Sequence, residues 1–182
     1  MPGMNSVIGV IDRNGNTVLH IAARLGDKET ARQAINMGAD VSAVEFGGLT
    51  PLHLALSNGH ERVARLLIRS GAMVSIGDYD GWSPLHVAVG VGHLRLAQLI
   101  IERGAKTSAA SRTGRTPLHL AAANGYESLA RLLINKGADI TAIDENRATP
   151  LFIAQSCGHE AVAQLLRDRL ENGEGRPGQG RQ

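Results

Sequence analysis

Apolar residues in this chain recur as two short helical patterns, one after the other, with a glycine at the end of each. The first predicted helix begins at Pro51, and one of its sides carries Leu52, Ala55 and Leu56. The second covers residues 60–69, where the positions with helical spacing are Val63, Ala64, Leu66, Leu67 and Ile68. Gly59 and Gly71 follow the two patterns, as expected of residues that end a helix in a left-handed conformation. The polar stretch 75–81 then predicts a turn before the next pair of helices.

The segment that opens the first helix returns every 33 residues along the chain. Its complete copies are Thr50-Pro51-Leu52-His53, Ser83-Pro84-Leu85-His86 and Thr116-Pro117-Leu118-His119, and looser copies begin at Thr17 and Thr149. The same spacing holds for Gly26, Gly59, Gly92, Gly125 and Gly158. A fixed period of this size predicts a solenoid, in which stacked units contact only their neighbours.

The period and the Thr-Pro-Leu-His motif resemble those of the ankyrin repeat, over roughly residues 12–171. The resemblance implies an all-α solenoid of stacked helix-turn-helix units with β-turn or hairpin fingers. We expect a lead-in over residues 1–11 and a disordered tail over residues 172–182. Between them, the predicted repeats are 12–44, 45–77, 78–110, 111–143 and 144–171.

The recurring residues have physical roles that do not depend on the family. The hydroxyl of Thr50 is suited to accept a hydrogen bond at the helix N-terminus, and Pro51 occupies the first helical position, where its missing N–H costs nothing. The turn glycines Gly15, Gly48, Gly81 and Gly114 give way to Arg147 in the last repeat. If φ is positive there, a β-carbon costs roughly 1–2 kcal/mol. Either the last turn has another shape, or it is strained.

The outermost repeats are more polar than the internal ones. In the first repeat Thr30, Gln33 and Ala34 replace Val63, Leu66 and Leu67, and in the last repeat Gln155 and Arg167 replace apolar residues. Polar end faces are what capping repeats require, so we expect a complete five-repeat domain. The last helix is expected to end at Asn172-Gly173.

Composition favours a cytoplasmic protein, with the nucleus as the other location, and argues against several functional classes. The single Cys157 rules out an internal disulfide framework, and no segment approaches the ~20 apolar residues of a membrane span. Residues 1–11 lack the basic start and apolar run of a secretory signal. The net charge is only +2 and the arginines are scattered over every repeat, which disfavours nucleic acid as a partner.

The seven histidines fall on two repeat positions, which favours structural roles over catalysis or metal binding. The resemblance implies that His20, His53, His86 and His119 hydrogen-bond neighbouring loop backbone. Cys157 has no adjacent base, and no phosphate loop, nucleophile elbow or pair of carboxylates is present. We therefore predict no enzymatic activity, no cofactor and no metal.

Function is expected where the repeats differ, at the turn tips and at the C-terminal ends of the first helices. The resemblance implies that partners contact this surface. The predicted partner-binding residues are Phe46, Leu49, Tyr79, Asp80, Trp82, Arg112, Arg115, Ser57, Asn58, Val91 and Asn124. Three of the five aromatic residues lie on the tips, which predicts a binding hot spot of Phe46, Leu49, Tyr79 and Trp82 flanked by Arg112 and Arg115. The competing hypothesis is that these rings pack along the loops and only stiffen them. We expect Tyr126 and Phe152 to be packing residues.

The leading interpretation is an adaptor or inhibitor that binds another protein through the tips and the adjoining groove. The alternative is a self-associating structural protein whose aromatic tips form a homodimer interface. A third possibility, a host-directed effector, is not supported by any specific residue of this chain.

Overall fold

The computed structural model describes residue 9 and residues 12–173 of the 182-residue chain. The described residues form ten α-helices and no β-strand. The helices are α1 (Val18–Leu25), α2 (Lys28–Asn36), α3 (Pro51–Ser57), α4 (Glu61–Arg69), α5 (Pro84–Gly90), α6 (Leu94–Glu102), α7 (Pro117–Ala123), α8 (Glu127–Asn135), α9 (Pro150–Ser156) and α10 (Glu160–Glu171). The predicted all-α architecture of paired helices is confirmed. The expected lead-in, and the expected disordered tail beyond Gly173, lie outside the described residues apart from Gly9.

The helices belong to two compact units, residues 1–87 and residues 88–182, and the boundary falls within α5. In the first unit α1 packs against α2 and α3, and α4 contacts both α3 and α2. In the second unit α7 packs against α8 and α9, α10 contacts α9 and α8, and α8 contacts α6. Within each unit, every helix pair therefore contacts the next, as the solenoid prediction requires.

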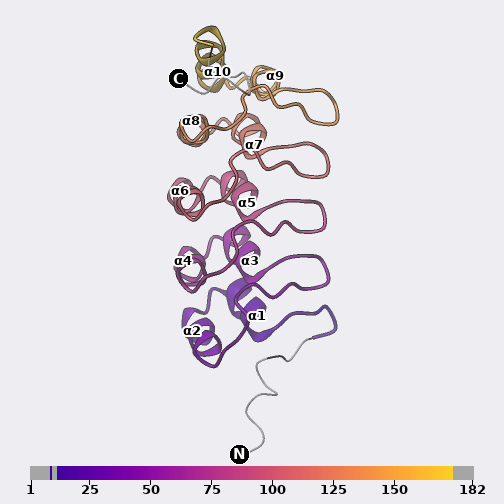
Figure 1. Cartoon of the computed structure of the whole chain (residues 1–182), viewed down its shortest axis with the longest axis vertical. Coiled ribbons are helices and arrows are strands. Elements are labelled where there is room, and N and C mark those ends of the chain that lie inside the picture. The colour runs from indigo at the N-terminus through magenta and orange to yellow at the C-terminus, as the bar shows by residue number, and fades with distance from the viewer. Residues whose placement is uncertain (1–8, 10–11, 174–182) are drawn as a thin grey trace, which may run out of the picture. The chain divides into compact units, whose positions relative to one another are not determined.

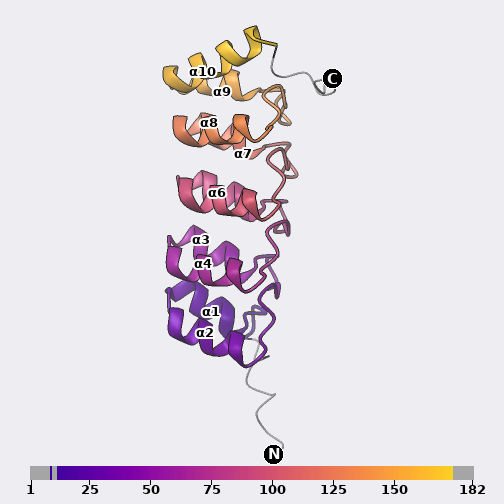
Figure 2. The same cartoon turned by 60° about the vertical axis from the view of Figure 1, so that its left-hand side comes forward.

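Loops project from the same side of the helix pairs within each unit (Figures 1 and 2). We call their tips fingers, residues 12–16, 45–49, 78–82, 111–115 and 144–148. Each finger is closed by a hydrogen bond from the backbone N–H of its first residue to the carbonyl of its last, as from Glu45 to Leu49 at 3.0 Å. This pairing confirms the predicted hairpin-like turns.

The core of each unit consists of leucine, isoleucine and valine side chains with alanines between them. In the first unit the fully buried residues include Leu19, Leu52, Leu56 and Leu67, and in the second unit Leu96, Ile100, Leu118, Leu133 and Leu166. Alanines such as Ala22, Ala55 and Ala121 are also fully buried. Their small side chains allow neighbouring helices to approach closely, which explains the low aromatic content of the chain.

The helices α1 and α3 each begin with a reciprocal cap between a threonine and the histidine three residues later, and the predicted N-cap role of Thr50 is confirmed. The Thr50 hydroxyl accepts a hydrogen bond from the backbone N–H of His53 at 3.4 Å. In return, the backbone N–H of Thr50 donates to Nδ1 of His53 at 3.2 Å. Thr17 and His20 form the same arrangement at the start of α1.

The glycines after α1, α5 and α7 are required both by their conformation and by an aromatic ring from the next repeat, whereas Gly158 after α9 meets no such ring. Gly26 has φ 74°, and a β-carbon there would lie 2.6 Å from Nδ1 of His60. Nε2 of His60 donates to the carbonyl of Arg24 at 3.0 Å, which holds the ring in this place. Tyr126 lies in the same way against Gly92, at 3.1 Å from the position of a β-carbon. The prediction that Tyr126 is a packing residue is therefore confirmed.

The prediction that Phe152 is a packing residue is wrong, because 60% of this residue is exposed. Phe152 occupies the position of His53 and His119, whose rings reach the finger of the following repeat. Within the described residues no finger follows α9 and α10, so the ring has nothing to pack against. The helix still begins at a cap, since the backbone N–H of Phe152 donates to the Thr149 hydroxyl at 3.2 Å.

Arg147 is the one residue other than glycine with a positive φ, 60°, in the described part of the chain. Its backbone N–H donates to the carbonyl of Asp144 at 2.8 Å, just as Gly48 donates to Glu45 at 2.9 Å. The last turn therefore has the same shape as the others. The expectation of a differently shaped turn is wrong, and the strained alternative remains.

Candidate partner-binding surface

A polar side chain at the first position of each finger fixes the loop backbone. In the first unit, Oε1 of Glu45 accepts the backbone N–H groups of Gly47 at 2.7 Å and Leu49 at 3.1 Å. Oδ1 of Asp78 accepts those of Asp80 at 3.0 Å and Trp82 at 2.8 Å. This role was not predicted from the sequence, although residues 12, 45, 78, 111 and 144 are acidic or hydroxylated at the 33-residue period.

Histidines of the first helices attach the fingers to the helical core. Nε2 of His20 donates to the carbonyl of Leu49 at 3.1 Å, and Nε2 of His53 donates to that of Trp82 at 2.9 Å. Since Nδ1 accepts a backbone N–H in both residues, we assign the neutral tautomer with its proton on Nε2. Burial, partly offset by the carbonyl hydrogen bond, lowers the pKa of each imidazole. The role that the resemblance implied for these two histidines is confirmed.

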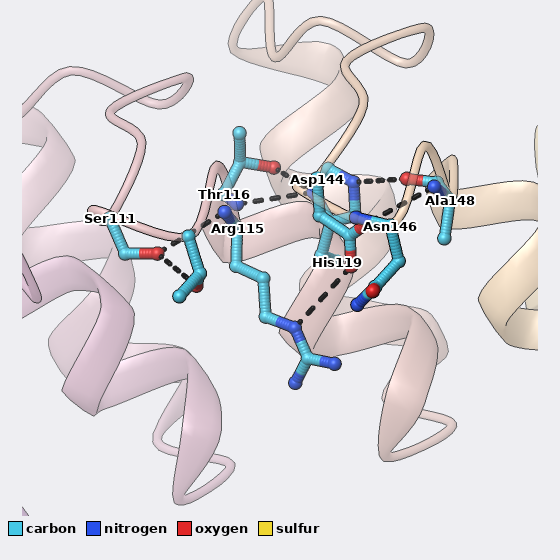
Figure 3. Close-up of polar contacts among 8 residues, drawn as sticks. Ser111, Arg115, Thr116, His119, Asp144, Asn146 and Ala148 are labelled. Atoms are coloured by element: carbon cyan, nitrogen blue, oxygen red, sulfur yellow. Dashed lines mark hydrogen bonds and ion pairs between the residues drawn. The ribbon is translucent and has the colours of Figure 1, made fainter.

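The second unit contains the same construction around Asp144 (Figure 3). Its Oδ1 accepts the backbone N–H groups of Asn146 and Ala148, each at 2.9 Å. Nε of Arg115 lies 3.6 Å from Oδ2 of the same carboxylate, and Nε2 of His119 donates to the carbonyl of Ala148 at 3.1 Å. Burial alone would raise the pKa of Asp144, but the two backbone donors and the neighbouring His119 and Arg115 lower it overall.

Phe46 and Tyr79 lie on the fingers of the first unit with most of their surface exposed, 67% and 59% respectively. One edge of each ring contacts the preceding finger. A β-carbon at Gly15 would lie 2.9 Å from Cδ1 of Phe46, and one at Gly48 would lie 2.8 Å from Cδ1 of Tyr79. The two backbones are held as well, because the N–H of Phe46 donates to Asn14 at 3.0 Å and that of Tyr79 to Gly47 at 3.4 Å. These two rings are thus fixed in place but not covered.

Trp82 and Leu49, the other members of the predicted hot spot, are only half-exposed. The Trp82 ring meets His86 edge to face, with ring centroids 5.4 Å apart and an interplanar angle of 76°. The competing hypothesis, that the rings pack against the chain's own residues, therefore fits Trp82 better than Phe46 and Tyr79.

The remaining predicted site residues are divided between the two units. Asp80 is exposed in the first unit, as are Ser57 and Asn58, whose side chains donate to the carbonyl of Leu54 at 3.2 and 2.8 Å. The residues in the second unit are Val91, Arg112, Arg115 and Asn124. Of these, Arg115 is half-buried and the other three are exposed. The aromatic residues and Asp80 thus belong to the first unit, whereas the two arginines belong to the second.

No group of three or more histidine, cysteine, aspartate or glutamate side chains that could hold a metal occurs in the described part of the chain. No helix within the described ranges is long and apolar enough to cross a membrane. Cys157 is exposed at the C-terminal end of α9.

A family model of ankyrin repeats, which contains three copies, matches residues 19–110, 74–144 and 107–174. These matches together cover most of the sequence, and the chain belongs to the ankyrin repeat family. Proteins of this family generally act as protein–protein interaction modules and are typically not enzymes. No curated protein matches the chain.

Proposed function

We propose that this chain is a non-enzymatic adaptor or inhibitor that binds a partner protein through its fingers and the adjoining ends of the first helices. The observation that carries the proposal is the exposure of Phe46 and Tyr79 on backbone-paired fingers of the first unit. Aromatic side chains are enriched among the residues that dominate binding energy, because they bury a large area and lose few degrees of freedom. We place its action in the cytoplasm or nucleus, with neither nucleic acid nor membrane as its target.

The rigidity of the fingers supports this proposal. Glu45 and Asp78 fix the loops that carry Phe46 and Tyr79, and His20 and His53 attach the ends of those loops to the helices. A surface that is ordered before it meets its partner loses less conformational entropy on binding. The same two rings would therefore contribute more affinity here than on a mobile loop.

We assign the two predicted arginines, Arg112 and Arg115, a secondary role in binding. Arg112 is exposed and forms no ion pair with any described residue, whereas Arg115 lies next to Asp144. A cation at the rim of an interface mainly changes the association rate and its dependence on salt. We expect Arg112→Ala to slow association at low salt and to reduce that dependence. An association rate that does not respond to salt in the unmodified protein would remove Arg112 from the surface.

Paired affinity capture and a binding titration test the proposal. The Phe46→Ala, Tyr79→Ala double variant should lose the partner that the unmodified chain retains. With the purified partner, its affinity should fall by about 2 kcal/mol or more, with little change in melting temperature. Phe152→Ala is the matched control, since it removes a similarly exposed ring from the second unit and should leave affinity unchanged. A double variant that melts earlier but binds as tightly would leave the rings with a purely structural role.

Self-association through the same rings is the alternative function, since exposed rings can also contact those of a second copy. A homodimer with closed symmetry would place the aromatic fingers of two copies in one interface. Light scattering at micromolar concentration separates the two functions, because only the alternative predicts a dimer. The double variant should then be monomeric.

A further inference from the structure

The fingers of the first unit combine exposed aromatic rings with an excess of negative charge. Residues 12–16, 45–49 and 78–82 contain four carboxylates, and Arg13 is the only cation among them. The nearby Arg24 is held by Asn16, whose Oδ1 accepts from its guanidinium at 2.8 Å. The three fingers therefore carry a net charge of −3 from four carboxylates and Arg13, and the neighbouring Arg24 reduces this excess to −2.

These carboxylates differ in how far the fingers themselves use them. Asp12, Glu45 and Asp78 each accept backbone N–H groups of their own loop. Asp80 is exposed, and its carboxylate forms no hydrogen bond or ion pair with any residue of the described chain. Its position next to Tyr79 is nevertheless fixed, because its backbone N–H donates to Oδ1 of Asp78 at 3.0 Å. Asp80 therefore offers both carboxylate oxygens at the edge of the aromatic surface.

We propose that this surface binds arginine side chains of the partner, with the guanidinium stacked on Phe46 or Tyr79 and paired with Asp80. The inference rests on the proposed function and adds the chemistry of the partner to it. A guanidinium is planar, stacks on aromatic faces, is more weakly hydrated than an ammonium and pairs with a carboxylate through two parallel hydrogen bonds. Arginine is thus the side chain whose recognition requires both features found here.

Other partner chemistries fit less well. A purely apolar partner would cover Asp80 and leave its charge unpaired in the interface, which is costly. An acidic partner would be repelled by the four carboxylates of these fingers. A lysine would be attracted by the charge, but its ammonium cannot stack as a plane on a ring or form the two-pronged pair.

The test uses the full chain and a short blocked peptide of alternating glycine and arginine, titrated by calorimetry. The control peptide carries citrulline, which keeps the shape of arginine but is neutral. We expect binding of the arginine peptide, weakened by added salt, and binding of the citrulline peptide about tenfold weaker or worse, since tenfold corresponds to about 1.4 kcal/mol. Equal binding of the two peptides, or no binding of either, would overturn the inference.

Variants locate the site on the protein. Asp80→Asn keeps the shape of the residue and removes its charge, and it should weaken the arginine peptide about fivefold or more, within the range of a cation–π and carboxylate pair. Phe46→Ala, Tyr79→Ala should weaken it further, whereas Phe152→Ala should not change it. An equal effect of all three variants would mean general adhesion of a polycation and would overturn the proposal.

The same variants separate failure of this inference from failure of the proposed function. If the natural partner is lost with Phe46→Ala, Tyr79→Ala but binds Asp80→Asn normally, the proposed surface stands and the arginine specificity does not. Light scattering tests the remaining possibility, that a second copy of this chain occupies the surface. A dimer that Asp80→Asn dissociates would mean that a second copy supplies the arginine, which overturns the choice of a separate partner.

Discussion

At the scale of single residues, the turn glycines are required by their positive φ and by their contact with the next finger. At Arg147 only the first of these two constraints applies. All have positive φ, but Gly15, Gly48 and Gly114 also lie against the next finger. A β-carbon at Gly48 would be 2.6 Å from the backbone nitrogen of Tyr79, and one at Gly114 would be 3.0 Å from Cα of Asp144. No finger follows Arg147 within the described residues, so its side chain meets no such obstacle. Only the conformational cost remains.

Replacing Arg147 with glycine should therefore stabilise the protein. Relief of a left-handed conformation is worth roughly 1–2 kcal/mol, and the extra freedom of glycine in the unfolded chain offsets part of it, so we expect a net gain of about 0.5–1 kcal/mol. Urea denaturation measures this change. Arg147→Ala is the control, because it removes the long side chain but keeps the β-carbon and should bring no such gain. A variant Arg147→Gly that is no more stable than the original would refute the strain.

The variant Gly48→Ala in an internal turn tests how much the contact with the next finger contributes to stability. Gly48→Ala adds the conformational cost and also forces the β-carbon into the Tyr79 backbone. The loss should reach at least about 2 kcal/mol, because backbone cannot move aside as a flexible side chain can. A loss as small as the gain at Arg147 would mean that the finger contact is unimportant.

The identity of a residue predicted its backbone conformation better than it predicted the contacts and exposure of its side chain. The caps, the left-handed glycines and the strain at Arg147 follow from properties that each residue carries with it. Phe152 was misjudged because its exposure depends on what lies beyond it, and its own position in the motif does not reveal that. The polar residues that organise the fingers recur at the 33-residue period, but no role for Glu45 and Asp78 was predicted from the sequence.

At the scale of elements, the Thr-Pro-Leu-His segment joins three parts of the fold. In the first unit Thr50 caps α3, His53 returns a hydrogen bond to Thr50, and the other nitrogen of the same ring holds the carbonyl of Trp82. One segment therefore fixes a helix start and the finger of the following repeat together. In α9 only the cap remains, since Phe152 has no polar atom to return.

Two threonine variants measure how much the link between the cap and the histidine contributes to the free energy of unfolding. Thr50→Ala removes the cap and also the hydroxyl that lies 2.8 Å from Nδ1 of His53. Thr149→Ala removes a cap alone. Within the usual 0.5–2 kcal/mol for a lost N-cap, we expect Thr50→Ala to fall in the upper half and Thr149→Ala in the lower half. Equal losses in denaturant unfolding would show that the histidine adds nothing to the cap.

At the scale of the whole molecule, the sequence predicted the fold far better than the binding surface. A period of 33 residues determines the helix pairs, because each repeat must bury its apolar side against a neighbouring repeat. The surface depends instead on positions that differ between repeats, and no periodic rule predicts them. Counting aromatic residues selected Phe46, Tyr79 and Trp82 together, but only the structure distinguishes the exposed rings from Trp82, which meets His86.

The distribution of buried histidines over both units makes the stability of the protein dependent on pH. Burial lowers the pKa of His20, His53 and His119 below the ordinary value of 6.5. As the pH falls through 6.5, the unfolded chain binds protons before the folded chain does, so the free energy of unfolding decreases. Each histidine contributes a slope of at most about 1.4 kcal/mol per pH unit. Asp12, Asp27 and Asp144 have a lowered pKa as well, and their contribution is lost only below 3.8.

We therefore expect two separate acid steps, one beginning near pH 6.5 and one below pH 3.8. Urea unfolding at a series of pH values measures both, and nuclear magnetic resonance titration of the imidazoles assigns the first. His53→Gln should reduce the slope of the first step and leave the second unchanged, whereas Asp27→Asn, which removes a carboxylate with no histidine beside it, should do the reverse. Repeating the series at high salt removes the general repulsion that grows with positive charge in acid. Stability that stays constant or rises as the pH falls below 6.5 would contradict the neutral, buried state of these histidines, and with it the hydrogen bonds that hold the fingers to the helices.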